Sequence, residues 1–167
     1  ILFYKYSNER IKEMQSEIEA EANKVLEGVT AEMSEYDKVK YFYDYLASNV
    51  VYDESEENCR DIYGVFVKKK AICGGFSKAF SYLCDKVGIE TATVTGDADG
   101  EPHMWNKVKI DGKWYNIDVT YAVTESEVGR YVRYDYFCVT DAMLKDSRDV
   151  YEQTYTYPEA VSEDCDY

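Results

Sequence analysis

The sequence predicts an α+β fold in which N-terminal helices pack on an antiparallel β-sheet. Apolar residues recur at helical spacing across residues 7–28, 34–50 and 73–87. After Gly88 the spacing changes to that of strands, and an Asp-Gly pair at 111–112 marks a two-residue hairpin turn. A block of helices followed by a block of strands is typical of the α+β class.

The first two helices carry recognisable start and stop signals. The first is predicted to begin after the N-cap Ser7 and to end at Gly28. At the start of the second, Ser34 and Asp37 resemble a capping box in which Asp replaces the usual Glu or Gln. Both helices therefore have ends that the sequence itself defines.

The third helix follows a polar stretch. An acidic loop at 52–61 and a short helical turn at 61–70 lead to a helix that begins near Cys73. Its apolar residues form one stripe, and Gly88 is a suitable C-terminal stop.

The second half of the chain is predicted to consist of strands. A strand at 89–98 precedes the hairpin, whose arms span residues 103–110 and 113–123, and a further strand follows at 130–140. A short helix is then expected at 141–148, with Thr140 as its cap.

Length and charge limit the classes of function. The 167 residues predict one domain over positions 1–167, and 33 acidic against 19 basic residues give a net charge of −14. This charge repels phosphate backbones, so nucleic acid is not an expected partner. No apolar run approaches a membrane span, and the N-terminal residues do not form an intact signal peptide.

The cysteines do not form a disulfide or zinc pattern. Five cysteines are an odd number, there is no Cys-x-x-Cys, and the chain holds one histidine. We therefore expect no metal site and no cofactor. The cysteines expected to be structural are Cys59, Cys84, Cys138 and Cys165.

The hairpin predicts a contact between His103 and Asp118. With a two-residue turn, directly opposed residues have numbers that sum to 223, so Trp105 faces Asp118. Strand side chains alternate, so His103 and Trp105 lie on one face. His103 and Asp118 are then diagonal neighbours at about 7–8 Å, close enough for their side chains to hydrogen-bond. A carboxylate that orients an imidazole is half of a nucleophilic triad.

Cys73 is the expected nucleophile. It stands at a predicted helix N-terminus within "KKKAICGGFSKAF", where the helix dipole and a nearby imidazolium would favour the thiolate. Its own backbone N–H is free to bind an oxyanion. Gly74 and Gly75, which destabilise a helix, are expected to form the wall past which a substrate backbone runs.

Three motifs together resemble the transglutaminase-like superfamily, a branch of the papain-like enzymes. They are "AICGGFSKAFSYLCDKVGI", "HMWNKVKI" and "DGKWYNIDVTYA", and the resemblance covers residues 37–122 well and extends more loosely to 144. It implies a papain-like fold, with Cys73 as nucleophile, His103 as general base and acid, and Asp118 as orienting carboxylate. The chain is most similar to short bacterial domains of this type, which implies a secreted or cell-surface location.

The resemblance leaves several points open. The second oxyanion donor varies within the family, and Asn49 and Tyr52 are both candidates. Trp105 is expected as part of the site wall.

The implied reaction is acyl transfer from an amide to water or to an amine, on a peptide or protein substrate that includes cell-wall or surface proteins. Hydrolysis is slightly favoured because it requires no second binding site. The alternative is a non-catalytic binding or scaffold module of the same fold. A thiol redox protein would need a resolving cysteine that the sequence does not place.

Overall fold

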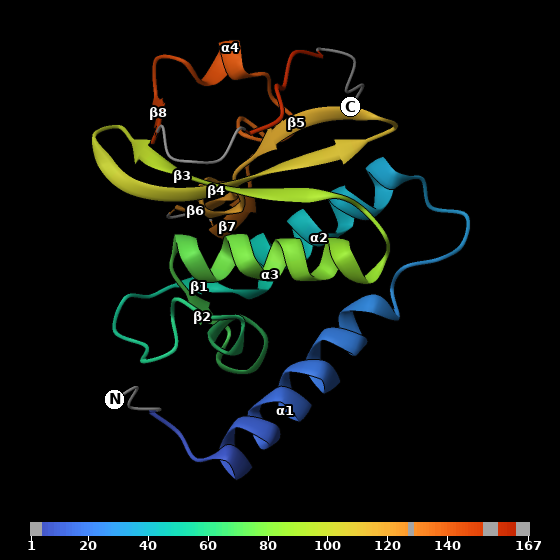
Figure 1. Ribbon diagram of the computed structural model, residues 1–167, viewed down its shortest axis with the longest axis vertical. Coiled ribbons are helices and arrows are strands. Elements are labelled where there is room, and N and C mark those ends of the chain that lie inside the picture. The colour runs from blue at the N-terminus through green and yellow to red at the C-terminus, as the bar shows by residue number, and fades with distance from the viewer. Residues whose placement is uncertain (1–4, 127–128, 152–156, 163–167) are drawn as a thin grey trace.

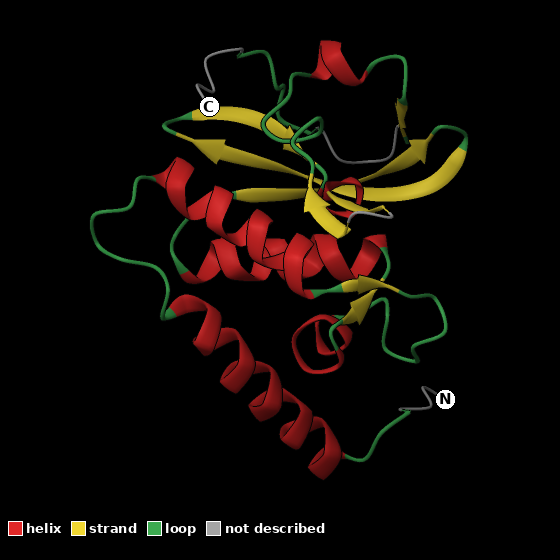
Figure 2. Cartoon of the chain, turned by 180° about the vertical axis from the view of Figure 1, so that it is seen from behind, coloured by secondary structure: helices red, strands yellow, loops and turns green. Residues whose placement is uncertain are grey.

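The computed structural model describes residues 5–126, 129–151 and 157–162. A four-stranded antiparallel sheet has α2 and α3 against one face and the C-terminal segment with α4 over the other (Figure 1, Figure 2). The predicted packing of N-terminal helices on an antiparallel sheet is confirmed. In sheet order the strands are β5 (Lys113–Ile117), β4 (Glu101–Ile110), β3 (Thr91–Ala98) and β8 (Arg148–Val150); the three helices are α2 (Glu35–Asn49), α3 (Cys73–Lys86) and α4 (Asp141–Leu144).

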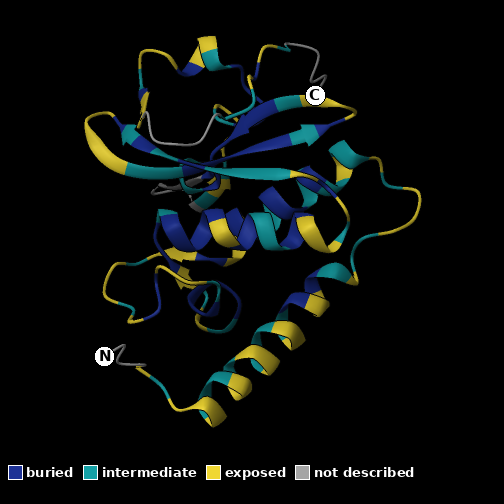
Figure 3. Cartoon of the chain, viewed as in Figure 1, coloured by how far each residue is buried: buried dark blue, intermediate teal, exposed yellow. Residues whose placement is uncertain are grey.

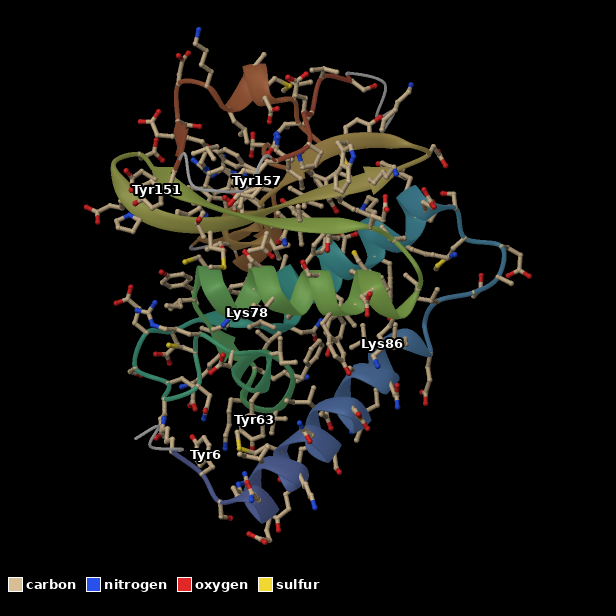
Figure 4. The ribbon with its side chains drawn as sticks, viewed as in Figure 1. Tyr6, Tyr63, Lys78, Lys86, Tyr151 and Tyr157 are labelled. Atoms are coloured by element: carbon tan, nitrogen blue, oxygen red, sulfur yellow. The ribbon has the colours of Figure 1, made fainter. Side chains whose placement is uncertain are left out.

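Helix α1 (Asn8–Leu26) lies outside the other helices and is largely exposed (Figure 3). The Ser7 side chain accepts a hydrogen bond from the Arg10 N–H, as the sequence predicted for an N-cap. Glu17 accepts hydrogen bonds from Arg10 and from Tyr63, which lies opposite α1 (Figure 4). Tyr63 precedes the π-helical turn η1 (Gly64–Lys68), so these contacts join α1 to the body of the fold.

Helices α2 and α3 supply most of the core beneath the sheet. The predicted capping box is present, since Ser34 and Asp37 exchange side chain to backbone hydrogen bonds. The fully buried side chains of Phe42 and Leu46 on α2 and Phe80 on α3 belong to one cluster with the inner face of the sheet. The apolar stripes that predicted these helices therefore form the hydrophobic core.

The hairpin register is the one that the Asp-Gly turn predicted. Ile110 pairs with Lys113, and the ladder continues with numbers that sum to 223 as far as Asn106 and Ile117. Asp111 and Gly112 both have positive φ, which is the signature of a type I′ turn.

The predicted strand at 113–123 is too long. After Ile117 the chain leaves the sheet, because the Asp118 N–H donates to the Tyr136 carbonyl. A 3₁₀ helix, η2 (Val119–Ala122), follows immediately.

The predicted strand at 130–140 is also wrong in most of its length. Two short strands, β6 (Val123–Ser126) and β7 (Gly129–Val132), pair with each other instead. Further on, only an isolated bridge joins Val139 to Asn116, since Cys138 adopts a positive φ of 54° that interrupts an extended chain.

Two structural features were not predicted. A parallel pair, β1 (Val51–Tyr52) and β2 (Lys70–Ala71), brings the chain after α2 beside the residues that precede α3. Edge strand β8 extends the sheet beside β3, and Tyr151 just beyond it lies near that strand (Figure 4). Within the described ranges, no helix is both long and apolar enough to cross a membrane.

Candidate active site

Cys73 is the first residue of α3, as predicted. The preceding residue, Ile72, makes no side-chain cap, so the first backbone N–H of the helix has no acceptor within the helix. The β1–β2 pair places Tyr52 opposite Ala71 and so beside the start of the helix. A partly exposed sulfur and a free N–H therefore occupy the same helix terminus.

His103 and Asp118 are hydrogen-bonded, as predicted, although the ladder ends at Asn106 and Ile117, just before the expected pairing of Trp105 with Asp118. The imidazole Nε2 lies 2.8 Å from Asp118 Oδ2, and the two side chains are 8% and 3% exposed. Cys73 lies beside the same ring, since both residues line one cavity, and with Nε2 engaged by Asp118 the nitrogen available to the thiol is Nδ1. The three side chains thus come together where α3, β4 and the end of β5 meet.

The pKa values of Cys73 and His103 move in opposite directions. Burial raises the pKa of the Cys73 thiol, but the hydrogen bond and charge of His103, with the N–H groups of Met104 and Gly74, leave this pKa below its ordinary value. Burial lowers the pKa of His103, and hydrogen bonds to Asp118 and Cys73 overcome this and raise it to about 9. Both shifts favour a thiolate–imidazolium pair.

Selective alkylation checks this ion pair. At pH 6 we expect limiting iodoacetamide to label Cys73 at least about tenfold faster than the other cysteines, because a thiolate is the reacting form. His103 should lose its proton as the pH rises through about 9, which ends the ion pair. Mass-mapped labelling over pH 4–10 measures the first effect, and equal rates at all accessible cysteines would contradict it.

A cavity of about 340 Å³ opens beside these groups. Of the two suggested oxyanion donors, Tyr52 lines this cavity. Asn49 does not: its side chain is exposed and donates to the Tyr45 carbonyl within its own helix. The lining residues are Tyr52, Cys73, Ala98, Glu101, Pro102, His103, Thr120, Tyr121 and Arg133.

Trp105 supports the imidazole from beneath the surface. Its ring is stacked on His103 with 6.2 Å between centroids, and the residue is 1% exposed. The indole N–H donates to the Asn116 side chain. Trp105 is therefore outside the set of residues that line the cavity, and it fixes the His103 ring through packing.

Gly74 and Gly75 are buried and lie outside the cavity lining. A Cβ on Gly75 would stand 2.4 Å from the Cys59 carbonyl oxygen, which is closer than any stable contact. A Cβ on Gly74 would have its nearest neighbour, the Arg60 carbonyl oxygen, at 3.7 Å. The expectation that both glycines make room for substrate is corrected for Gly75, which makes room for the chain's own backbone.

A pair of alanine substitutions separates these two glycines. We expect Gly75→Ala to lower the free energy of unfolding by about 1–3 kcal/mol, because the helix must move away from the Cys59 carbonyl. Gly74→Ala should leave stability unchanged or raise it, since alanine is the better helix former. Chemical denaturation of both variants measures the difference, and equal stabilities would refute the packing role of Gly75.

Arg148 is a site residue that sequence reasoning missed. Its Nη2 donates to Asp118 Oδ2 over 3.0 Å, and its side chain is 1% exposed. The residue stands on edge strand β8, 30 residues after its partner. A single arginine in a polar stretch gives no signal that could identify this contact from the sequence.

The other described cysteines do not line the cavity. Cys59, Cys84 and Cys138 are buried, and Cys165 lies outside the described residues. Burial raises the pKa of the Cys84 thiol far above its ordinary value. Across residues 5–126, 129–151 and 157–162, no group of three or more His, Cys, Asp or Glu side chains is arranged to hold a metal ion.

Comparison with known proteins gives a family and two structural relatives. A model of the transglutaminase-like superfamily matches residues 22–119, which is more than half of the chain. Kyphoscoliosis peptidase of Mus musculus is 23% identical over 105 residues, which are 53% of this chain and 16% of that protein. The chain is thus much shorter than this curated relative.

Two solved structures share the fold. One described as a TGase matches with a TM-score of 0.57 and 26% identity, over 76% of this chain and 36% of that chain. A candidate cysteine protease from Cytophaga hutchinsonii matches with a TM-score of 0.51 and 19% identity, over 70% and 43%. These matches confirm the papain-like, transglutaminase-core fold that the three motifs implied.

Proposed function

This chain belongs to the transglutaminase-like superfamily, and from that membership we propose that it is a thiol enzyme acting on amide bonds of peptides or proteins. The observation that carries the proposal is the pair His103–Asp118, hydrogen-bonded at 2.8 Å, with Cys73 and His103 lining one cavity at the start of α3. The opposite pKa shifts of the first two residues support it, because structural cysteines have no need of an activated thiolate.

In the first half of the reaction, the Cys73 thiolate attacks the carbonyl carbon of the substrate. The developing oxyanion is held by the Cys73 backbone N–H and, as the second donor, by the Tyr52 hydroxyl. His103 gives its proton to the departing amine as the C–N bond breaks, which leaves a thioester on Cys73. Asp118 keeps the ring oriented and stabilises the imidazolium.

In the second half, water or a primary amine attacks the thioester. His103 takes a proton from the attacking group, and the thiolate leaves as the new carboxylate or amide forms. Hydrolysis remains the favoured outcome, because it needs no site for a second substrate.

A peptide library tests the proposal and separates the two outcomes. The protein is incubated with amide-rich peptides, with and without an added primary amine, and products are identified by mass. Cleaved or deamidated products support hydrolysis, and products carrying the amine support transfer. If neither forms and Cys73 is unreactive toward alkylation at pH 6, the catalytic proposal is refuted and a binding module is favoured.

A further inference from the structure

Asp118 is held between two cations at its Oδ2 atom. That oxygen accepts from His103 Nε2 at 2.8 Å and from Arg148 Nη2 at 3.0 Å. Both carboxylate and guanidinium are almost fully buried, with 3% and 1% of their side chains exposed. A buried arginine is stable only with a charged or well hydrogen-bonded partner, so Asp118 is the partner that this position requires.

The guanidinium is held by two aromatic rings and a backbone carbonyl. Its central carbon lies 4.4 Å from the ring centroid of Tyr121 and 4.7 Å from that of Tyr136, and these two rings are in edge contact with each other. Its Nη1 donates to the Ser147 carbonyl over 3.0 Å. Contact with aromatic rings while donating several hydrogen bonds suits arginine better than lysine, because the guanidinium is weakly hydrated and carries five donors.

Strand β8 brings Arg148 to this position. Arg148 pairs with Ala98, and Val150 pairs with Gly96, along the edge of β3. A Cβ on Gly96 would stand 2.0 Å from the Asp149 carbonyl oxygen, so only glycine lets the edge strand approach this closely. The glycine at position 96 of β3 therefore allows β8 to approach, and with it Arg148.

The four groups form a row of alternating charge. Arg148 is permanently positive, and Asp118, His103 and Cys73 follow as carboxylate, imidazolium and thiolate. The row sums to zero when Cys73 is a thiolate, and to one net positive charge when it is a thiol. A buried group of charges is more stable when it is neutral, so the arginine favours the ionised sulfur.

Other titratable groups face this row from neighbouring elements. The Asp99 carboxylate is 3.9 Å from Arg148 Nη1 but is 62% exposed. Arg133 is paired with Asp135 at 2.7 Å, and both are largely exposed. Other groups are Glu101 of the cavity lining and the hydroxyls of Tyr43, Tyr52, Tyr121 and Tyr136. Exposed charges are screened by solvent, so among the described residues Arg148 is the cation with the strongest effect on Asp118 after His103 itself.

We propose that Arg148 is a positioning residue of the reaction, which fixes the Asp118 carboxylate and balances its charge so that His103 can pair with the Cys73 thiolate. Without Arg148, the carboxylate would neutralise the imidazolium alone, and the sulfur would retain its proton. The family model ends at residue 119, so this contribution comes from outside the matched region. The inference rests on the proposed function, because it concerns how that site is activated.

Two substitutions separate charge from hydrogen bonding. Arg148→Gln keeps a donor for Asp118 and removes the charge, whereas Arg148→Lys keeps a charge. We expect Arg148→Gln to slow Cys73 alkylation at pH 6 by about tenfold and to move the midpoint of its pH profile upward by about one unit. Alkylation of Arg148→Lys should stay within about threefold of the wild type at pH 6, while its turnover falls because the guanidinium contacts with Tyr121 and Tyr136 are lost.

Lys107→Gln is the matched control. Lys107 is a second buried cation that anchors the C-terminal segment, through Asp141 at 2.8 Å and the Pro158 carbonyl at 2.6 Å. Its loss should lower the melting temperature and leave the alkylation profile of Cys73 unchanged. Melting curves of all variants are recorded beside the pH profiles.

The outcomes distinguish this inference from the proposed function. A fast wild-type Cys73 whose pH profile is the same in Arg148→Gln overturns the role of Arg148 alone. Equal upward shifts in Arg148→Gln and Lys107→Gln would show a general effect of destabilisation and also overturn it. If both Arg148 variants unfold, Arg148 is a folding residue and the positioning role is wrong. A wild-type Cys73 no faster than the buried thiols refutes the proposed function itself.

Discussion

Replacement of Cys73 by alanine is expected to reduce turnover of an amide substrate on the order of 10⁵- to 10⁶-fold, as loss of the nucleophile does in covalent hydrolases. Without sulfur no thioester can form, and the remaining oxyanion donors and substrate contacts can only assist direct attack by water. The fold should survive, since Cys73 is partly exposed and lies at a helix end.

Cys84→Ala is the control for this prediction. Cys84 lies on the same helix, is fully buried and belongs to the core cluster. Its replacement should lower stability by creating a small cavity, and should leave turnover within about threefold at temperatures below melting. The test is to measure initial rates at saturating peptide and melting curves for the wild type and both variants. A Cys73→Ala protein with more than a tenth of wild-type turnover would exclude this residue as the nucleophile.

The second large effect is expected for Asp118→Asn, with a fall in turnover of about 10²- to 10³-fold. The amide no longer favours the ring tautomer that presents Nδ1 to Cys73, and it stabilises the imidazolium less. The loss should be smaller than in a serine triad, because the resting cysteine enzyme already holds an ion pair. Alkylation of Cys73 at pH 6 should slow in parallel, since the pKa values of the two groups are coupled.

Stability should also fall in this variant. If His103 were the only partner of Asp118, the nearly isosteric Asp118→Asn substitution would leave the melting temperature unchanged. Because Arg148 is buried against the same oxygen, the substitution leaves its charge uncompensated, at a cost of about 3 kcal/mol. For a chain of this length, that corresponds to a decrease in melting temperature of about 6–12 °C.

Asp141→Asn separates the catalytic effect from the structural one. Asp141 pairs with the buried cation Lys107, so Asp141→Asn also leaves a buried cation without its charged partner, but Asp141 belongs to α4, which lies across the sheet from α2 and α3. This variant should melt at a lower temperature and keep its turnover. If Asp118→Asn likewise melts lower and keeps turnover within tenfold, then Asp118 has only a structural role.

The elements that the sequence predicted well are those determined by local rules. Helices α1, α2 and α3 each have an apolar stripe, α1 and α2 begin at side-chain caps, and a glycine follows α1 and α3. The contact of His103 with Asp118 was predictable because a two-residue turn fixes the register of everything near it. The geometry of the turn therefore predicted one contact between side chains that are 15 residues apart in the sequence.

The errors fall where tertiary contacts override local preference. Valine and tyrosine favour a strand at 130–140, but hydrogen bonds to the end of β5 and the positive φ of Cys138 interrupt it. Strands β1 and β2 hold two residues each, too few to show a period. Gly75 was misread because the carbonyl that requires it belongs to a distant loop.

The separation of Asp118 and Arg148 along the chain affects the order in which the site is completed during synthesis. The two residues are 30 positions apart, and a ribosome adding about 5–20 residues per second needs a few seconds to cover that distance. During this interval the chain already contains its thiol, imidazole and carboxylate, but not the guanidinium. If Arg148 acts as proposed, the Cys73 thiol of the nascent chain keeps its proton until β8 is synthesised and docked, and it ionises only when folding is nearly finished.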